Sequence, residues 1–203
     1  MSFTVLVIIL IVTVLVSLNA INNEELKNKL MFIPSRCKEN GEGYRFISHI
    51  LVHADLPHLF FNMFTLYFMG KGVEHYFIKD FGVIKGEIYF VVLYVLGGLF
   101  ATLIPYARNH NNSNYRSLGA SGAVSAVVFA FVIWSPMQEL LVMGIPMKAW
   151  LFGIIYLGLE FYLDKKGNTG VAHDAHIGGA IFGVIFVLII NIDKGKDILD
   201  LVF

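Results

Sequence analysis

The sequence predicts an all-α membrane protein built as a bundle of six transmembrane helices. The 203-residue chain is 57% hydrophobic and 15% charged, and six long apolar stretches follow one another along it. A soluble domain carries roughly 25% charged residues, and a bilayer span needs about 20 mostly apolar residues. The predicted spans are residues 2–21, 58–77, 88–107, 119–134, 145–163 and 175–192, within a single membrane domain covering residues 1–203.

The first apolar stretch is also compatible with a signal peptide. It lacks a basic amino-terminal region and a convincing small-x-small cleavage site, so we interpret it as a retained span. The polar interval that follows, residues 22–57, mixes charges with Phe32, Tyr44 and Phe46. This mixture predicts a structured first loop with short amphipathic helices that touches the membrane surface.

Charge and cysteine content exclude several classes of protein. Fifteen basic and fifteen acidic residues give a formal net charge of zero, so nucleic acid is not an expected partner. The single cysteine, Cys37, cannot form an internal disulfide. Counting Lys and Arg gives nine outside and six inside when the amino terminus is inside, against the positive-inside rule. Leaving out the first loop reverses the balance to six inside and four outside, so charge alone decides the orientation only weakly.

Strongly polar residues stand at the start of three predicted spans. They are His58 with Asn62 in the second span, Ser121 in the fourth, and His173-Asp174-Ala175-His176 at the sixth. Polar groups at membrane depth are costly and usually mark a function or a buried pair. Alternate spans run in the same direction, so we expect these sites to lie at one level of the membrane.

Ser121 lies in the segment Gly119-Ala120-Ser121-Gly122. Small neighbours allow a sharp turn and the close approach of a carbonyl group to a serine hydroxyl. A helix start also offers free N–H groups to a developing oxyanion. The alternative is that these small residues only allow close helix packing.

His176 makes a catalytic interpretation of Ser121 stronger. Neutral imidazole can accept the proton of a serine hydroxyl, and Gly179 and Gly183 would let the sixth span approach the fourth closely. Asp174 lies two residues before His176 and would point about 200° away on a helix. We therefore expect a Ser-His dyad and not a triad.

His58 and Asn62 are four residues apart and share a helix face. Both can donate hydrogen bonds to an oxyanion, although an interhelical polar contact is the alternative. Histidine pairs at 49/53 and 173/176 have spacings that metal ligands use. The sequence contains no H-E-x-x-H motif, so we expect neither a metal site nor a cofactor.

From residue 43 to residue 187 the chain resembles the rhomboid intramembrane serine proteases. The resemblance rests on five motifs in the family's order: Tyr44-Arg45, "HILVHADLPHLFFNM", "GKGVE", "GASGAVSA" and "AHIGGAIFG". It implies a minimal six-span bacterial form with both termini cytoplasmic. The active site would then open to the outside of a bacterial plasma membrane.

The resemblance also implies roles for individual residues. Ser121 would be the nucleophile and His176 the general base, with His58 and Asn62 on the oxyanion side and His53 beside them. Gly119 and Gly122 flank the serine. The remaining matched residues would be structural: Tyr44, Arg45, Glu74, Gly179 and Gly183.

The implied activity is cleavage of single-span transmembrane substrates within the bilayer. Ser125 is a departure, because the family often has a tyrosine there whose ring stacks on the catalytic histidine. The alternative function is a catalytically silent rhomboid-like protein that binds transmembrane helices. The sequence leaves the natural substrate and the oligomeric state open.

Overall fold

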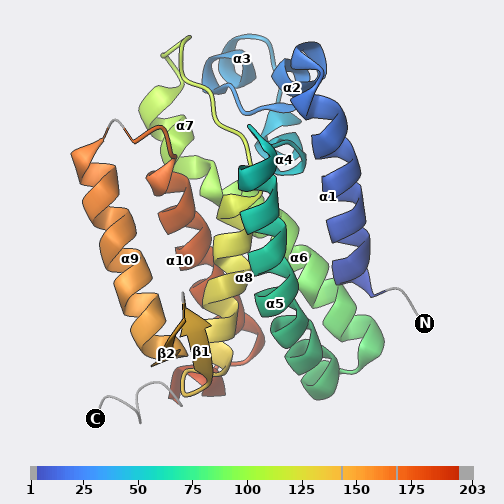
Figure 1. The fold of residues 1–203 in the computed structure, drawn as a ribbon, viewed down its shortest axis with the longest axis vertical. Helices are drawn as coiled ribbons and strands as arrows, with labels where there is room; N and C mark the ends of the chain where they lie inside the picture. The colour runs from blue at the N-terminus through green and yellow to red at the C-terminus, as the bar shows by residue number, and fades with distance from the viewer. Residues whose placement is uncertain (1–3, 143, 168, 197–203) are drawn as a thin grey trace.

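The computed structural model describes residues 4–142, 144–167 and 169–196, which form a predominantly helical bundle (Figure 1). Residues 2 and 3 of the first predicted span lie outside the described residues. The long helices are α1 (Val5–Ile21), α5 (Leu56–Phe81), α6 (Val83–Ala101), α8 (Ser121–Trp134), α9 (Ala149–Lys166) and α10 (His173–Ile190). The short helix α7 (Leu103–Asn109) continues α6 after Thr102.

Helix α8 is the centre of the bundle. It packs against α5, α6 and α10, and all of its residues except Ser121 and Ile133 are buried. A helix that is apolar on every side is stable only when other helices surround it. Helix α1 covers the α5 side of the bundle, and α9 covers the α10 side (Figure 1).

The first loop lies above the ends of the long helices (Figure 1). It contains α2 (Glu24–Leu30), α3 (Pro34–Glu39), α4 (Arg45–Ser48) and a 3₁₀ turn, η1 (His49–Leu51), so the predicted short helices are present. Phe32 pairs with Ser117 through two backbone hydrogen bonds of 2.9 and 3.0 Å. This pairing ties the first loop to the segment that leads into α8.

The prediction for the fifth span was wrong at its start. Residues 145–148 form the strand β2 (Ile145–Lys148), which pairs antiparallel with β1 (Glu139–Val142), and α9 begins at Ala149. Proline is tolerated in the first turn of a helix, so Pro146 does not by itself exclude one; the antiparallel pairing of residues 145–148 with residues 139–142 makes this segment a strand.

Two described helical stretches are long and apolar enough to cross a bilayer. They are Val83–Asn109, which joins α6 and α7, and His173–Ile190. Helices α1 and α8 are apolar but shorter, while α5 and α9 are long enough but carry charged residues such as Lys71 and Asp164. The count of six membrane spans therefore remains a prediction.

Candidate active site

A cavity of about 700 Å³ opens at the end of the bundle where α5, α8 and α10 begin. The three helices run in the same direction, so their first residues lie at the same end of the bundle (Figure 1). The sequence predicted this arrangement, because alternate helices of a bundle run in the same direction. The residues that line the cavity include His58, Asn62, Tyr115, Ser121, Val171 and His176. Burial raises the pKa of Tyr115 to about 12, and the nearby Asp174 acts in the same direction, so the phenol stays protonated at neutral pH.

Ser121 is the first residue of α8. The residue two positions before it, Gly119, has a φ of +122°, which side chains of L-amino acids rarely adopt. This turn directs the chain into the helix, whose N-cap, Ala120, makes no side-chain hydrogen bond. The unpaired N–H groups and the positive dipole end of α8 therefore lie at the serine.

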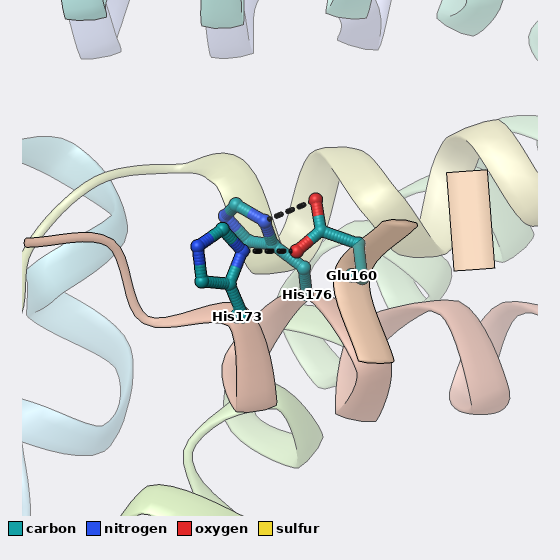
Figure 2. Close-up of side chains that lie close together, drawn as sticks. All are labelled: Glu160, His173 and His176. Carbon is teal, nitrogen blue, oxygen red and sulfur yellow. Dashed lines mark hydrogen bonds and ion pairs between the residues drawn. The ribbon is translucent and has the colours of Figure 1, made fainter. Parts of the chain in front are cut away.

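His176 forms a hydrogen bond with Ser121 across two helices. The distance from His176 Nε2 to Ser121 Oγ is 2.7 Å. On the other side of the ring, His176 Nδ1 lies 3.0 Å from Glu160 Oε1. The second oxygen of this carboxylate, Oε2, lies 2.6 Å from His173 Nδ1, so one glutamate joins two imidazoles (Figure 2).

Glu160 is a site residue that the sequence reasoning missed. It is on α9 and is 8% exposed, between the two histidines of α10. A signal for it was present, because a carboxylate in an apolar predicted span is as unusual as the histidines that were singled out. Its partners depend on how α9 packs on α10, which no short motif encodes.

Asp174 does not contact His176. Its Oδ2 accepts a hydrogen bond of 3.3 Å from Arg108 Nη1, which also donates to Asp164 Oδ1 at 2.8 Å. The backbone is helical from His173 onward, so the 200° separation expected from the sequence applies. Asp174 links α10 to α7 and, through Arg108, to α9.

His58 and Asn62 both line the cavity from α5. Asp55 caps this helix by accepting a 2.7 Å hydrogen bond from the His58 N–H, and Asn62 Nδ2 donates to the His58 carbonyl at 2.9 Å. The His58 ring lies against Gly119, where a Cβ atom would come within 2.7 Å of it. The absence of a side chain at Gly119 therefore makes room for His58.

His53 lies behind the serine and does not line the cavity. It is fully buried, with Nε2 accepting a 3.2 Å hydrogen bond from the Ala120 N–H and Nδ1 lying 2.8 Å from Ser17 Oγ. Ser17 donates its hydroxyl proton to the Leu51 carbonyl at 2.8 Å, so His53 Nδ1 carries the proton that Ser17 accepts. His53 thus fixes the turn before Ser121 as a neutral imidazole.

Three further predicted residues, Tyr44, Arg45 and Glu74, lie in the scaffold around the site. Arg45 is 2% exposed and donates from Nη1 to the carbonyls of Asn28 and Met31, both at 2.8 Å, while Tyr44 lies beside its guanidinium. Glu74 on α5 accepts a 2.9 Å hydrogen bond from the Leu6 N–H at the start of α1.

Ser125 makes a contact that the sequence did not predict. Its Oγ lies 2.7 Å from the hydroxyl of Tyr156 on α9. Residue 125 of α8, where the family often has a tyrosine, therefore contacts a tyrosine of the neighbouring helix α9. Its hydroxyl is bonded to Ser125, and His176 is held by Glu160.

The metal alternative has one geometric observation in its favour. Potential ligand atoms of Glu160, His173 and His176 all lie within 4.8 Å of one another. The other pair of histidines is engaged elsewhere, because His49 Nδ1 bonds to the Arg45 carbonyl and His53 bonds to Ser17 and Ala120. Measuring activity with and without a chelator tests whether Glu160, His173 and His176 hold a metal.

Comparison with known proteins gives a consistent family match. A family model for the Rhomboid domain matches residues 40–192 of this chain. The chain is 27% identical to RHOMBOID-like protein 12, mitochondrial, of Arabidopsis thaliana over 81% of this chain and 51% of that protein. It is also 26% identical to rhomboid protease GluP of Bacillus subtilis, over 76% of this chain and 27% of GluP.

A shorter bacterial relative is covered more fully. Rhomboid protease GlpG of Haemophilus influenzae is 27% identical, over 77% of this chain and 74% of GlpG. By contrast, the match spans about half of the Arabidopsis protein and about a quarter of GluP.

Proposed function

The chain belongs to the rhomboid family of integral membrane proteins, and from this we propose that it is an intramembrane serine endopeptidase. The observation that carries the proposal is the 2.7 Å contact between His176 Nε2 and Ser121 Oγ beside a cavity. A serine hydroxyl becomes an effective nucleophile when a neutral imidazole can take its proton. Ser121 is the nucleophile and His176 the general base.

The reaction proceeds in two halves. Ser121 Oγ attacks the carbonyl carbon of the scissile peptide while its proton moves to His176 Nε2. His176 then gives this proton to the leaving amine as the C–N bond breaks, which leaves an acyl-enzyme. A water molecule repeats the sequence, giving its proton to His176 and releasing the carboxylic acid and free Ser121.

The oxyanion formed in each half lies at the start of α8. Free N–H groups of its first turn and the side chains of His58 and Asn62, which line the same cavity, are the available donors. Such donors are effective because they are fixed before the charge develops. His53 contributes indirectly, by holding the Ala120 N–H and therefore the turn before Ser121.

Six membrane spans account for the arrangement of the long helices. They are α1, α5, α6 with α7, α8, α9 and α10, in one membrane domain with the first loop on the side of the cavity. The 14 residues of α8 span about 21 Å, which is less than the roughly 30 Å of a bilayer core. Ser121 then lies below the membrane surface, and the cavity admits the water that hydrolysis requires.

The substrates are single-span membrane proteins. A transmembrane helix protects its own peptide bonds, so the segment that is cut must unwind locally, which favours small residues at the cut and helix-weakening residues nearby. We place the protein in a bacterial plasma membrane with the cavity facing outside, although its relatives include mitochondrial and bacterial proteins.

The test is cleavage of a model single-span substrate with a small residue at the expected cut. Purified wild type is compared with Ser121→Ala, His176→Ala and Ser135→Ala, the last being a serine at the opposite end of α8. We expect cleavage by wild type and Ser135→Ala, and a loss of at least about 100-fold in the other two variants.

Other outcomes point to the alternatives. Folded wild type that binds the substrate helix without cutting it would identify a catalytically silent helix-binding protein. Cleavage by Ser121→Ala would remove the catalytic assignment. Loss of wild-type activity with a chelator, and its return with Zn²⁺, would favour a metal at Glu160, His173 and His176.

A further inference from the structure

We propose that Glu160 is a positioning residue that extends the Ser-His dyad to a Ser121–His176–Glu160 triad. This inference rests on the proposed function, since it concerns how the base of that reaction is held. The family resemblance implies only serine and histidine. The carboxylate comes from α9, a helix that carries neither of them.

The hydrogen bonds around His176 determine which of its nitrogens carries the proton. A carboxylate only accepts hydrogen bonds, so the contact of Glu160 Oε1 with His176 Nδ1 at 3.0 Å places the ring proton on Nδ1. Nε2 is then unprotonated and faces the Ser121 hydroxyl at 2.7 Å. This is the tautomer that a general base needs, and the carboxylate also stabilises the imidazolium that forms.

His173 fixes the carboxylate in turn. It donates from Nδ1 to the other oxygen, Oε2, at 2.6 Å, and its Nε2 lies 2.9 Å from Thr169 Oγ1. Both oxygens of Glu160 are therefore engaged by imidazoles, and the carboxyl group cannot rotate without breaking one contact. Glu160 and His173 are both buried, at 8% and 7% exposure, so water competes little for these bonds.

Helix α9 is held in register by two more polar contacts on the same face. Tyr156, four residues before Glu160, bonds to Ser125 of α8 at 2.7 Å. Asp164, four residues after it, accepts from Arg108 of α7 at 2.8 Å. Residues four apart lie on one side of a helix, so this stripe fixes both the rotation and the height of Glu160.

The charged and titratable groups around His176 come from four helices. Glu160 and His173 contact it through the shared carboxylate, His58 interacts with it electrostatically from α5, and Asp174 is paired with Arg108 of α7. Of these, Glu160 is the anion within hydrogen-bond distance of the His176 ring. Removal of the Glu160 carboxylate should therefore change the acid limb of the pH–rate profile more than removal of any of the other groups would.

The experiment compares wild type with Glu160→Asp, Glu160→Gln and Glu160→Leu in the substrate-cleavage assay. Glu87→Gln is the matched control, because Glu87 also lies in a helix and bonds to a backbone N–H, that of Val5, away from the cavity. We measure kcat, KM, the pH–rate profile and the rate at which a fluorophosphonate labels Ser121.

We expect kcat and labelling rate to fall at least about tenfold in Glu160→Gln and further in Glu160→Leu, with partial recovery in Glu160→Asp. KM should change little, because Glu160 does not line the cavity. The pH–rate profile of the remaining activity should differ from that of wild type, because the imidazolium that forms on His176 loses its anionic neighbour. Glu87→Gln should match wild type.

Two results would overturn the inference while the proposed function stands. One is wild-type kcat and pH profile in folded Glu160→Leu. The other is a lower melting temperature with unchanged activity per folded molecule, which would make Glu160 purely structural. If all glutamate variants unfold, NMR of ¹⁵N-histidine-labelled wild type decides: a hydrogen-bonded Nδ1–H on His176 supports the triad, and an Nε2–H contradicts it. An inactive wild type would instead overturn the proposed function.

Discussion

Gly179 of α10 lies against Gly122 of α8 so closely that a Cβ atom on Gly179 would come within 2.0 Å of the Gly122 carbonyl oxygen. One turn further along, a Cβ atom on Gly183 would lie 2.2 Å from the Ala126 carbonyl oxygen. Backbone atoms cannot move aside as a flexible side chain can. The distance between Ser121 and His176 therefore depends on glycine at these two positions.

Gly179→Ala should separate α8 from α10 and lengthen the Ser121–His176 hydrogen bond. We expect at least a tenfold loss of proteolysis and a destabilisation of about 1–3 kcal/mol, the usual cost of overpacking. Gly158→Ala is the control, because a Cβ atom there meets nothing within 4 Å. Cleavage assays and thermal unfolding of both variants test this, and equal behaviour of the two would contradict it.

Gly119→Ala should disturb the turn before Ser121. Its φ of +122° is strained for alanine, at about 1–3 kcal/mol, and the new methyl group would displace the His58 ring. We expect lower activity and a lower melting temperature. Gly43→Ala, in an open and unstrained position, should show neither change. Full activity in Gly119→Ala would show that the His58 position is unimportant for the reaction.

Arg45→Gln should loosen the first loop. The substitution removes a buried guanidinium that bonds to two carbonyl groups, and leaving these acceptors unpaired costs about 1–3 kcal/mol each. We expect a lower melting temperature and faster proteolytic cleavage between residues 22 and 55. Arg36→Gln, at an exposed position in the same loop, is the control. Indistinguishable proteolysis of the two variants would argue against a bracing role for Arg45.

Stability should fall in acid because of two buried histidines in the first loop. Burial lowers the pKa of His49 to about 4, and burial together with nearby His58 lowers that of His53 to about 3, against an ordinary value of 6.5. Below pH 6.5 the unfolded chain binds protons that the folded protein does not. Stability is therefore complete above pH 6.5 and decreases by about 1.4 kcal/mol per pH unit for each histidine as the pH falls toward 4.

Unfolding free energies measured between pH 8 and pH 4 check this dependence. His53→Gln should reduce the slope of the unfolding free energy against pH by about 1.4 kcal/mol per pH unit, which corresponds to one proton, whatever its effect on stability at pH 8. An unchanged slope would show that His53 does not contribute to the acid sensitivity.

Much of the fold was predictable because long apolar stretches have few alternatives to helix. The predicted starts of α5, α8 and α10 lie within two residues of their observed positions. That the three starts lie at one end of the bundle was also predictable, because successive spans alternate in direction. The error at residues 145–148 arose because four apolar-rich residues fit a helix or a strand equally well. Pairing with residues 139–142, which depends on a turn, decided between them.

The sequence by itself determined the helical bundle, the rhomboid resemblance, and the candidate pair Ser121 and His176, because these depend on apolar length and on local motifs. Only the tertiary structure decided which nitrogen of His176 faces Ser121, that His53 lies behind the serine, and that Glu160 reaches His176. These contacts join helices that are far apart in the chain. Their geometry is set by how α9, α10 and α8 pack, and no local pattern of residues specifies it.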